Sequence, residues 1–321
     1  MRTALVASLA LTVAVQTAAA QSTVARLEVI PIQSTTLDTG QFLRGDKDGK
    51  PVQIAGELRL PTQGTDKLPA VILIHGSGGL SGAADRWAGE LLGLGVAVFL
   101  VDSFSGRGIV NTINDQSQLS TLAMMADAYR ALAVLSEHPR IDRNRIAVMG
   151  FSKGAVAAVY SAVERFHNMY GPGVSFAAHI GLYTPCNVAY RDDDKVARKP
   201  IRLFHGIADD YVAIGPCRSY VERLKKAGAD VALAEYPNAL HAYDNSALAK
   251  PIKLPQGQTT RNCALREAER GDIVNARTGK HFDLHDPCVE LGPQVGYNAA
   301  AHQATVKAVK QFLTTTFALG K

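Results

Sequence analysis

Residues 150–154 read Gly-Phe-Ser-Lys-Gly, so that a glycine lies two positions before and two positions after a serine. The apolar run at 145–149 predicts a strand before them, and the small residues at 154–165 predict a helix after them. The tight turn between strand and helix holds the serine in a strained conformation. A bulky side chain at either flanking glycine would crowd this turn, so both positions need small residues. The helix also points its free N–H groups at the serine. The stretch therefore predicts a serine nucleophile, Ser152.

The whole chain has a globular composition. It contains 321 residues, of which 47% are hydrophobic and 20% are charged, enough for one large core. No linker rich in Pro, Gly or Ser, no low-complexity run and no internal repeat divides it. We therefore expect one domain over residues 21–321.

The first twenty residues have the pattern of a secretory signal peptide. A basic start at Arg2 precedes an apolar stretch at 4–15, and an Ala-x-Ala pattern at 18–20 precedes Gln21. The stretch is too short for a lasting transmembrane helix. The alternative is a buried N-terminal helix. We expect residues 1–20 to be removed and the protein to be exported, periplasmic or secreted, without membrane attachment.

The charge of the chain argues against a nucleic-acid partner. Removing residues 1–20 removes one charged residue, Arg2, and lowers the net charge from +5 to +4. The basic residues are scattered, with no Arg/Lys stripe and no interleaved aromatic residues. We therefore expect no binding to nucleic acid.

Four cysteines follow the signal peptide. They are Cys186, Cys217, Cys263 and Cys288. An even number of cysteines in an exported chain predicts disulfides, and three pairings are possible. Our prediction is the sequential pairing, Cys186–Cys217 and Cys263–Cys288. The first bridge would brace the loop that contains Asp209.

Strands alternate with helices over most of the chain. Strands are predicted at 26–32, 52–60, 70–74, 95–101, 145–149, 177–183, 201–205 and 230–236, and helices at 83–92, 116–137, 213–227 and 299–317. This alternation predicts an α/β fold with a mainly parallel sheet. Active sites in such sheets lie at the carboxyl ends of the strands.

One segment, at about 246–294, does not fit the alternation. It is long, polar and irregular, it directly follows His241, and it contains Cys263 and Cys288. Unstructured segments of this length are uncommon unless they are functional or cross-linked. We predict an insertion held by a disulfide that covers the site. The alternative is a surface excursion at the edge of the sheet, without contact to substrate.

The serine needs a base, and the base needs a carboxylate to orient it. In enzymes built around this turn, the acid and then the histidine follow the serine along the chain. Asp209 lies four residues after the strand at 201–205 and is the predicted acid, with Asp210 as the alternative. His241 lies in the loop after the next strand and is the predicted base. None of the other eight histidines has that context.

The transition state also needs hydrogen-bond donors for its oxyanion. The backbone N–H of Lys153 is one predicted donor. The glycine-rich turn after residue 74 supplies the other, from Ser77 or from Gly78 close behind. Because Lys153 is expected to act through its backbone, Lys153→Ala should keep much of the activity.

Arg107 follows a strand end and could bind a substrate carboxylate in bidentate fashion, or else tie down its own loop or pair with Asp102.

Neither a cofactor nor a metal is expected. The glycines at 76–79 do not form a phosphate loop, because the sequence G-x-x-x-x-G-K-[ST] is absent. A metal site from His281, His285 and Cys288 is the alternative to the second disulfide, but the chain contains no C-x-x-C pair.

Five stretches together resemble the dienelactone hydrolase family of α/β-hydrolases. They are residues 75–79, 102–108, 150–154, 205–211 and 239–243. The resemblance implies an α/β-hydrolase fold and hydrolysis of a small-molecule ester. The founding enzymes of that family use a cysteine nucleophile on a cyclic lactone, whereas this chain has Ser152. The departure indicates a general serine carboxylesterase that acts through an acyl-serine intermediate.

Two other functions remain open. The same triad could serve a peptidase or an acyltransferase, although the chain lacks the large propeller domain of prolyl-oligopeptidase-like proteins. A binding protein that keeps the fold without catalysis is the third possibility, and an intact triad argues against it.

Overall fold

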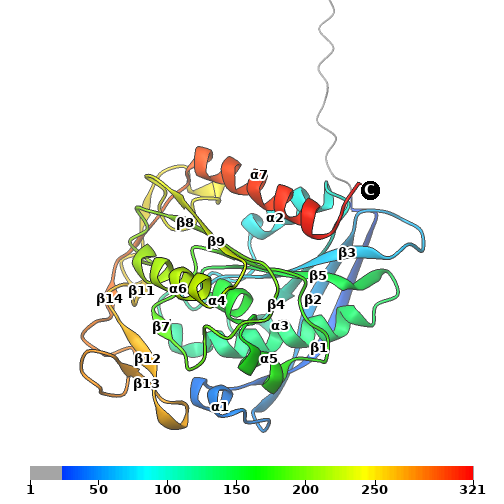
Figure 1. The fold of residues 1–321 in the computed structure, drawn as a ribbon. Coiled ribbons are helices and arrows are strands. Elements are labelled where there is room, and N and C mark those ends of the chain that lie inside the picture. The colour runs from blue at the N-terminus through cyan, green and yellow to red at the C-terminus, as the bar shows by residue number, and fades with distance from the viewer. Residues whose placement is uncertain (1–23, 321) are drawn as a thin grey trace, which may run out of the picture.

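The structure is a computed structural model that describes residues 24–320, so the predicted signal peptide at 1–20 lies outside the described residues. Its centre is a sheet of eight strands in the order β1-β2-β4-β3-β5-β6-β8-β9 (Figure 1). The strands are β1 (Arg26–Thr36), β2 (Lys50–Leu60), β3 (Leu68–Ile74), β4 (Ala97–Asp102), β5 (Ile141–Phe151), β6 (His179–Leu182), β8 (Ile201–Gly206) and β9 (Val231–Tyr236).

The sheet is mainly parallel, as the sequence predicts. Every neighbouring pair from β4 to β9 is parallel, and β2 alone runs against its neighbours β1 and β4. Alternate residues of β3 enter two different cores: Ile72 belongs to the core on one face, and Val71 belongs to the core on the other. A strand buried on both faces needs a continuous apolar run, which explains the sequence of β3.

Helices cover both faces of the sheet (Figure 1). They are α1 (Thr39–Arg44), α2 (Gly82–Leu92), α3 (Thr121–Ser136), α4 (Lys153–Tyr160), α5 (Glu164–Tyr170), α6 (Ile214–Lys226) and α7 (Ala299–Thr316), with short 3-10 helices η1 (Ser105–Arg107), η2 (Gln116–Gln118), η3 (Ser246–Leu248) and η4 (Glu269–Gly271). α3, α4, α5 and α6 pack on one face, and α2 and α7 pack on the other.

Residues 39–44 form α1, a helix that is not among the predicted ones; Asp38 and Gln41 make a reciprocal capping box that starts it, a signal that is readable in the sequence. One local prediction differs from the structure. The predicted helix at 154–165 is two helices, because α4 ends before Ser161 and Val163 forms a β-bridge with Val196 before α5 begins.

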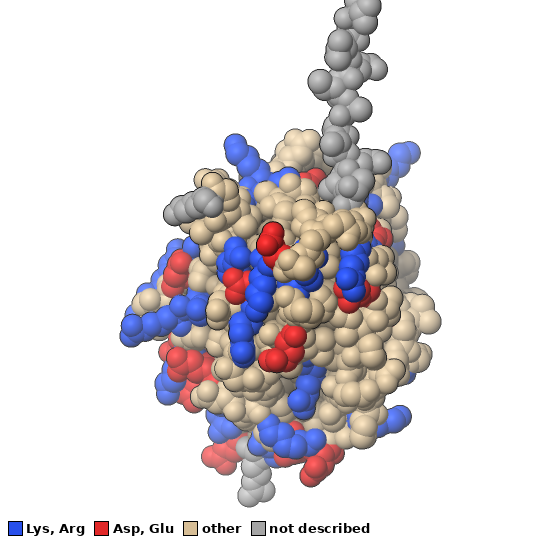
Figure 2. All heavy atoms as spheres, turned by 90° about the vertical axis from the view of Figure 1, so that its right-hand side faces the viewer, with Lys and Arg blue, Asp and Glu red and all other residues tan. Residues whose placement is uncertain are grey.

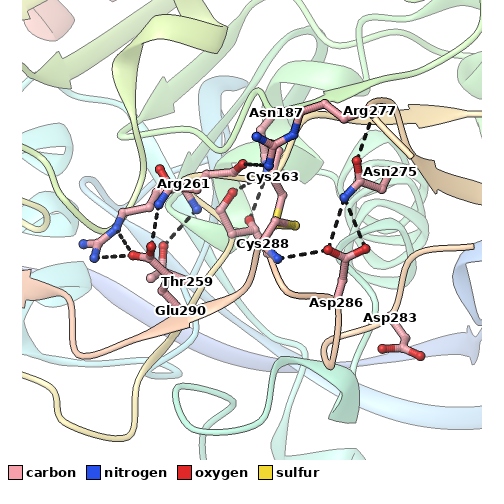
Figure 3. Close-up of a disulfide and its surroundings, with 12 residues drawn as sticks. Asn187, Thr259, Arg261, Cys263, Asn275, Arg277, Asp283, Asp286, Cys288 and Glu290 are labelled. Atoms are coloured by element: carbon pink, nitrogen blue, oxygen red, sulfur yellow. Dashed lines mark hydrogen bonds and ion pairs between the residues drawn. A yellow bond between two sulfur atoms is a disulfide. The ribbon is translucent and has the colours of Figure 1, made fainter. Parts of the chain in front are cut away.

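The segment at 246–294 contains only very short strands. They are β10 (Ile252–Lys253), β11 (Gln258–Thr259), β12 (Leu265–Glu267), β13 (Ile273–Asn275) and β14 (Glu290–Leu291), followed by β15 (Gln294–Val295). They form three small sheets. One of these sheets also includes β7 (Val188–Ala189), which lies outside the segment, between β6 and β8. The disulfide Cys263–Cys288 joins two parts of the segment, and polar contacts surround it (Figure 3).

The face shown in Figure 2 has basic and acidic side chains intermixed, without a field of one sign. Ion pairs at the surface of the described residues include Arg59 with Asp85 and Arg145 with Asp142. No helix within residues 24–320 combines the length and the apolar character that crossing a bilayer requires.

Candidate active site

Ser152 occupies a strained turn between β5 and α4. Its backbone has φ 51° and ψ −118°, a region that residues with a side chain rarely adopt. The two glycines of the motif are needed because the chain crosses itself closely here. A Cβ on Gly150 would lie 2.1 Å from the carbonyl oxygen of Gly154, and a Cβ on Gly154 would lie 2.3 Å from that of His75. The turn therefore excludes any side chain at both positions.

The structure brings the predicted base, acid and nucleophile into one hydrogen-bonded line. His241 Nε2 lies 2.9 Å from Ser152 Oγ, and His241 Nδ1 lies 2.8 Å from Asp209 Oδ2. Because an ionised carboxylate only accepts, Nδ1 carries the proton and Nε2 is free to accept from the serine hydroxyl. His241 and Asp209 are buried, while Ser152 is partly exposed. The arrangement can take the proton from the serine.

The Asp209 carboxylate is fully engaged. Its Oδ1 accepts the backbone N–H groups of Tyr211 and Val212, at 2.9 and 2.8 Å. Its Oδ2 faces His241 and also lies 3.5 Å from His205 Nε2. Burial alone would raise the pKa of this carboxyl, but the charges and hydrogen bonds of His241 and His205 hold the pKa of Asp209 well below its ordinary value. Asp209 therefore stays ionised when it orients the base.

Asp210, the alternative acid, points elsewhere. Its Oδ1 accepts the backbone N–H of Gln294 at 2.8 Å, and its Oδ2 lies 3.5 Å from Arg261 Nη1. Both partners belong to the 246–294 segment: Gln294 ends it, and Arg261 lies within it. Consecutive residues thus separate two tasks: Asp209 faces the base, and Asp210 holds the segment against the loop after β8.

The proposed oxyanion donors lie on both sides of Ser152. Lys153 is the first residue of α4, so its backbone N–H has no acceptor within the helix. The turn at 75–77 lies against the nucleophile, since a Cβ on Gly76 would be 3.3 Å from Ser152 Cβ. His75 fixes that turn: its Nδ1 donates to the Gly76 carbonyl, and its Nε2 accepts the N–H of Ser103. Burial lowers the pKa of His75, which keeps the ring neutral for these two roles.

Arg107 does not line the cavity at Ser152. Its guanidinium makes two hydrogen bonds to Asp127, at 2.8 and 3.0 Å, and donates to the carbonyl of Ser103 and to the hydroxyl of Thr36. The side chains of Arg107 and Asp127 are almost completely buried. The arginine therefore ties its own loop to α3 and β1. It does not pair with Asp102, whose carboxylate accepts backbone N–H groups of its own turn.

Two tyrosines flank the base, and the sequence analysis did not find them. The ring centroids of Tyr183 and Tyr211 lie 4.6 and 4.7 Å from that of His241. Burial raises the pKa of Tyr211 to about 12, so its hydroxyl is a neutral hydrogen-bonding group. The position of Tyr211 directly after the two aspartates was the available signal. Nothing in the sequence around Tyr183 pointed to the site.

Ser152 opens into a cavity of about 1090 Å³. One wall comes from the strand-end loops and α1, and the other comes from the inserted segment, which contributes Thr259, Arg261 and Phe282 among others. The segment therefore lines the same cavity as Ser152. Cys186 also lines the cavity and is bonded to Cys217, and Cys288 is bonded to Cys263, which removes it from the alternative metal site.

Residues 54–317 match the model of the dienelactone hydrolase family. No curated protein matches the sequence. Among solved structures, a dienelactone hydrolase-like promiscuous phosphotriesterase from metagenomic libraries is similar, with a TM-score of 0.56, 15% identity and coverage of 90% of this chain and 98% of that one. Esterase 2 of Thermogutta terrifontis, phosphoramylated by tabun, gives a TM-score of 0.58 at 17% identity, covering 93% of this chain and 98% of that one. At such identities the likeness to these structures shows the fold alone.

Proposed function

Because this chain belongs to the dienelactone hydrolase family and has its α/β-hydrolase fold, it is a hydrolase acting on ester bonds, and we propose that it cleaves carboxylic esters of small molecules through an acyl-serine intermediate. The observation that carries the proposal is the line from Asp209 through His241 to Ser152, with hydrogen bonds of 2.8 and 2.9 Å. This is the arrangement that turns a serine hydroxyl into a nucleophile.

In the first half of the reaction, Ser152 Oγ attacks the ester carbonyl carbon while His241 Nε2 takes the hydroxyl proton. Asp209 stabilises the imidazolium that forms. The carbonyl oxygen becomes an anion that accepts hydrogen bonds from the backbone N–H groups of Ser77 and Lys153. The tetrahedral intermediate then collapses: the carbon–oxygen bond to the alcohol breaks, and His241 gives its proton to the leaving alkoxide.

In the second half, water attacks the acyl-serine and gives its proton to His241. The same N–H groups stabilise the second oxyanion. Collapse breaks the bond to Ser152 Oγ, which takes back the proton from His241 and leaves a carboxylic acid. The strained backbone of Ser152 supports both steps, because in this conformation Oγ lies 2.9 Å from His241 Nε2.

The size of the cavity favours esters with a bulky group on one side. A volume of about 1090 Å³ is at the upper end for small-molecule sites, which hold drug-sized ligands. The proposed substrate class also agrees with the similar solved structures, one of which is an esterase phosphorylated by paraoxon.

We also propose that residues 21–321 act as one exported domain after removal of residues 1–20. Two disulfides support this proposal, since such bonds persist in oxidising compartments. The signal-peptide pattern of the sequence supports it independently. The mass of the protein recovered from an expression host tests it: a chain that begins at Gln21 agrees with the proposal, and one that retains residues 1–20 contradicts it.

A fluorophosphonate probe tests the proposed chemistry. We expect wild type to be labelled at Ser152 and to hydrolyse p-nitrophenyl acetate, and Ser152→Ala to do neither. Ser103→Ala is the matched control, because this serine lies buried beside the site without a place in the triad, and we expect it to be labelled like wild type. Equal labelling of Ser152→Ala would refute the nucleophile. Faster turnover of a matched amide than of the ester would favour a peptidase.

A further inference from the structure

The side chain of Lys153 is buried beside the nucleophile, and the triad mechanism does not use it. Only 4% of the residue is exposed. Its ammonium group donates to the carbonyl oxygen of Gln116 at 3.0 Å, to Gln116 Oε1 at 3.2 Å and to Thr112 Oγ1 at 3.4 Å. All three acceptors are neutral. A lysine is almost never fully buried without an anionic partner, so this position requires an explanation.

The two partners of Lys153 both hold the turn that supplies the other oxyanion donor. Ser77 Oγ donates to Gln116 Oε1 at 3.0 Å, and the carbonyl of Ser77 accepts the N–H of Thr112 at 2.8 Å. The side chain of Ser77 is thus held by Gln116 and its main chain by Thr112. Lys153 lies behind both residues and connects them to the first turn of α4.

Gln116 also reaches two further parts of the site. Its backbone N–H donates to Gln258 Oε1 of the inserted segment at 2.8 Å, and its amide lies 3.5 Å from the hydroxyl of Tyr211. The residue therefore joins the oxyanion turn, the nucleophile helix, the acid loop and the insertion. Lys153 donates to both carbonyl oxygens of this residue, the one in its main chain and the one in its side chain.

We propose that the ammonium group of Lys153 is a positioning element of the oxyanion hole: through Gln116 and Thr112 it holds the Ser77 turn at the distance that the reacting carbonyl requires. This inference rests on the proposed function. It revises the expectation that Lys153 acts through its backbone alone, because the same residue supplies one oxyanion donor by its N–H and fixes the other by its side chain.

The charge of the Lys153 side chain makes its proposed role dependent on pH. Burial lowers the pKa of Lys153 to about 7, with Asp115 opposing the shift. The ammonium is therefore present below about pH 7 and is lost as the pH rises through that value. The other titratable groups around this turn are His75, Asp209, Tyr211 and His241. Of these, burial raises the pKa of Tyr211 to about 12, and His241 and His205 lower the pKa of Asp209, so neither group changes its charge near pH 7.

Loss of the proton from Lys153 weakens its hold on Gln116 and Thr112. A neutral amine donates two hydrogen bonds where the ammonium donates three, and its hydrogen bonds lack the assistance of a charge. The positive charge that Lys153 holds next to Gln116 and Thr112, the two residues that hold the Ser77 turn, disappears at the same time. We therefore expect kcat to fall as the pH rises above about 7 and Lys153 loses its proton.

Lys153→Met tests the proposal, since methionine keeps the backbone N–H and nearly the same shape without the charge. We expect kcat for p-nitrophenyl acetate at pH 6.5 to fall about 10- to 100-fold, with KM within threefold. This loss is smaller than the roughly 100- to 1,000-fold that follows removal of a whole oxyanion donor, because the donor remains and only its position is weakened. We expect the alkaline fall of kcat to disappear. The melting temperature should stay equal or rise at pH 6.5, because the variant no longer buries a charge, and this difference should shrink as the pH increases above 7.

Lys310→Met is the control for loss of a lysine charge elsewhere. Lys310 lies on α7 and pairs with Glu90 across the opposite face of the sheet, so its replacement should leave kcat and the pH profile unchanged. Gln116→Ala breaks the same link from the other side and serves if Lys153→Met does not fold. In a double-mutant cycle, the losses of kcat in Lys153→Met and Gln116→Ala should be far from additive, because both variants break the same connection between Lys153 and Gln116.

The outcomes separate the two proposals. A wild type that neither reacts with fluorophosphonate nor hydrolyses esters overturns both. An active wild type whose kcat and alkaline limb are unchanged in Lys153→Met, or in Gln116→Ala, overturns the role of Lys153 and leaves the triad intact. A loss confined to KM or to the melting temperature overturns it as well, because a purely structural side chain would act in that way.

Discussion

The two walls of the cavity are built by different means. The wall with Ser152, Asp209 and His241 stands on the ends of buried parallel strands, whose backbone hydrogen bonds and apolar side chains fix each loop. The opposite wall, residues 246–294, has strands of only two or three residues, and a disulfide and ion pairs hold it together (Figure 3). We therefore expect the first wall to set the rate of the reaction and the second wall to determine which substrates bind.

The largest effect should follow from Asp209→Asn in the first wall. Asparagine keeps the shape but can no longer accept the Nδ1 proton of His241 as an anion, so the wrong tautomer of the base is favoured. We expect kcat/KM for p-nitrophenyl acetate to fall about 1,000- to 10,000-fold, as for the corresponding acid in the serine protease triad. Because the pKa of Asp209 is held below its ordinary value, the loss should be constant above about pH 5.

Asp210→Asn is the matched control for this variant, since it removes the adjacent carboxylate. If Asp210→Asn lost as much kcat as Asp209→Asn, the division of tasks between the two residues would be wrong. A melting curve for each variant distinguishes a loss of catalysis from a loss of folding.

The first wall was predictable from the sequence. Each of its loops follows a stretch that the sequence predicts as a strand, and parallel strands end at one edge of the sheet. The order of serine, acid and histidine then selects among many polar residues. The choice between Asp209 and Asp210 needed coordinates, because adjacent residues point in different directions and only the contacts of each carboxylate distinguish them.

The second wall, and the details that depend on it, were less predictable. Strands of two residues leave no periodicity to read, so the segment was placed only by its position after His241 and by its cysteines. Arg107 was also ambiguous, because a buried partner 20 residues later, Asp127, cannot be inferred from local sequence. The side chain of Lys153 was missed for the same reason, since its contacts lie in a loop about 40 residues earlier in the chain.

The next largest effect should come from removing the disulfide of the second wall. The bond Cys263–Cys288 closes 25 residues, and a cross-link of that length restricts the unfolded segment by about 3 kcal/mol in the chain-entropy model. In the variant Cys263→Ser/Cys288→Ser we expect faster proteolysis within 246–294 and a KM for bulky esters raised about tenfold. The kcat for p-nitrophenyl acetate should change less than threefold.

The other disulfide provides the contrast. Cys217 is completely buried on α6, so Cys186→Ser/Cys217→Ser should lower the melting temperature of the whole domain. Cleavage that begins outside 246–294 in the Cys263→Ser/Cys288→Ser variant, or an equal loss of kcat for small and bulky esters, would show that the two walls are not separable.

The smallest effect should follow from Asp210→Asn, which acts where the two walls meet. The carboxylate accepts the N–H of Gln294 and faces Arg261, which is itself held by Glu290. Partly exposed pairs of this kind contribute about 0.2–1 kcal/mol, which corresponds to a change of less than about sixfold. We expect KM for a bulky ester to rise two- to fivefold and kcat to stay the same. Asp230→Asn removes a comparable pair with Arg202 at the far end of β9, so it should leave KM unchanged; a rise in KM in both variants would mean that Asp210 does not act through the second wall.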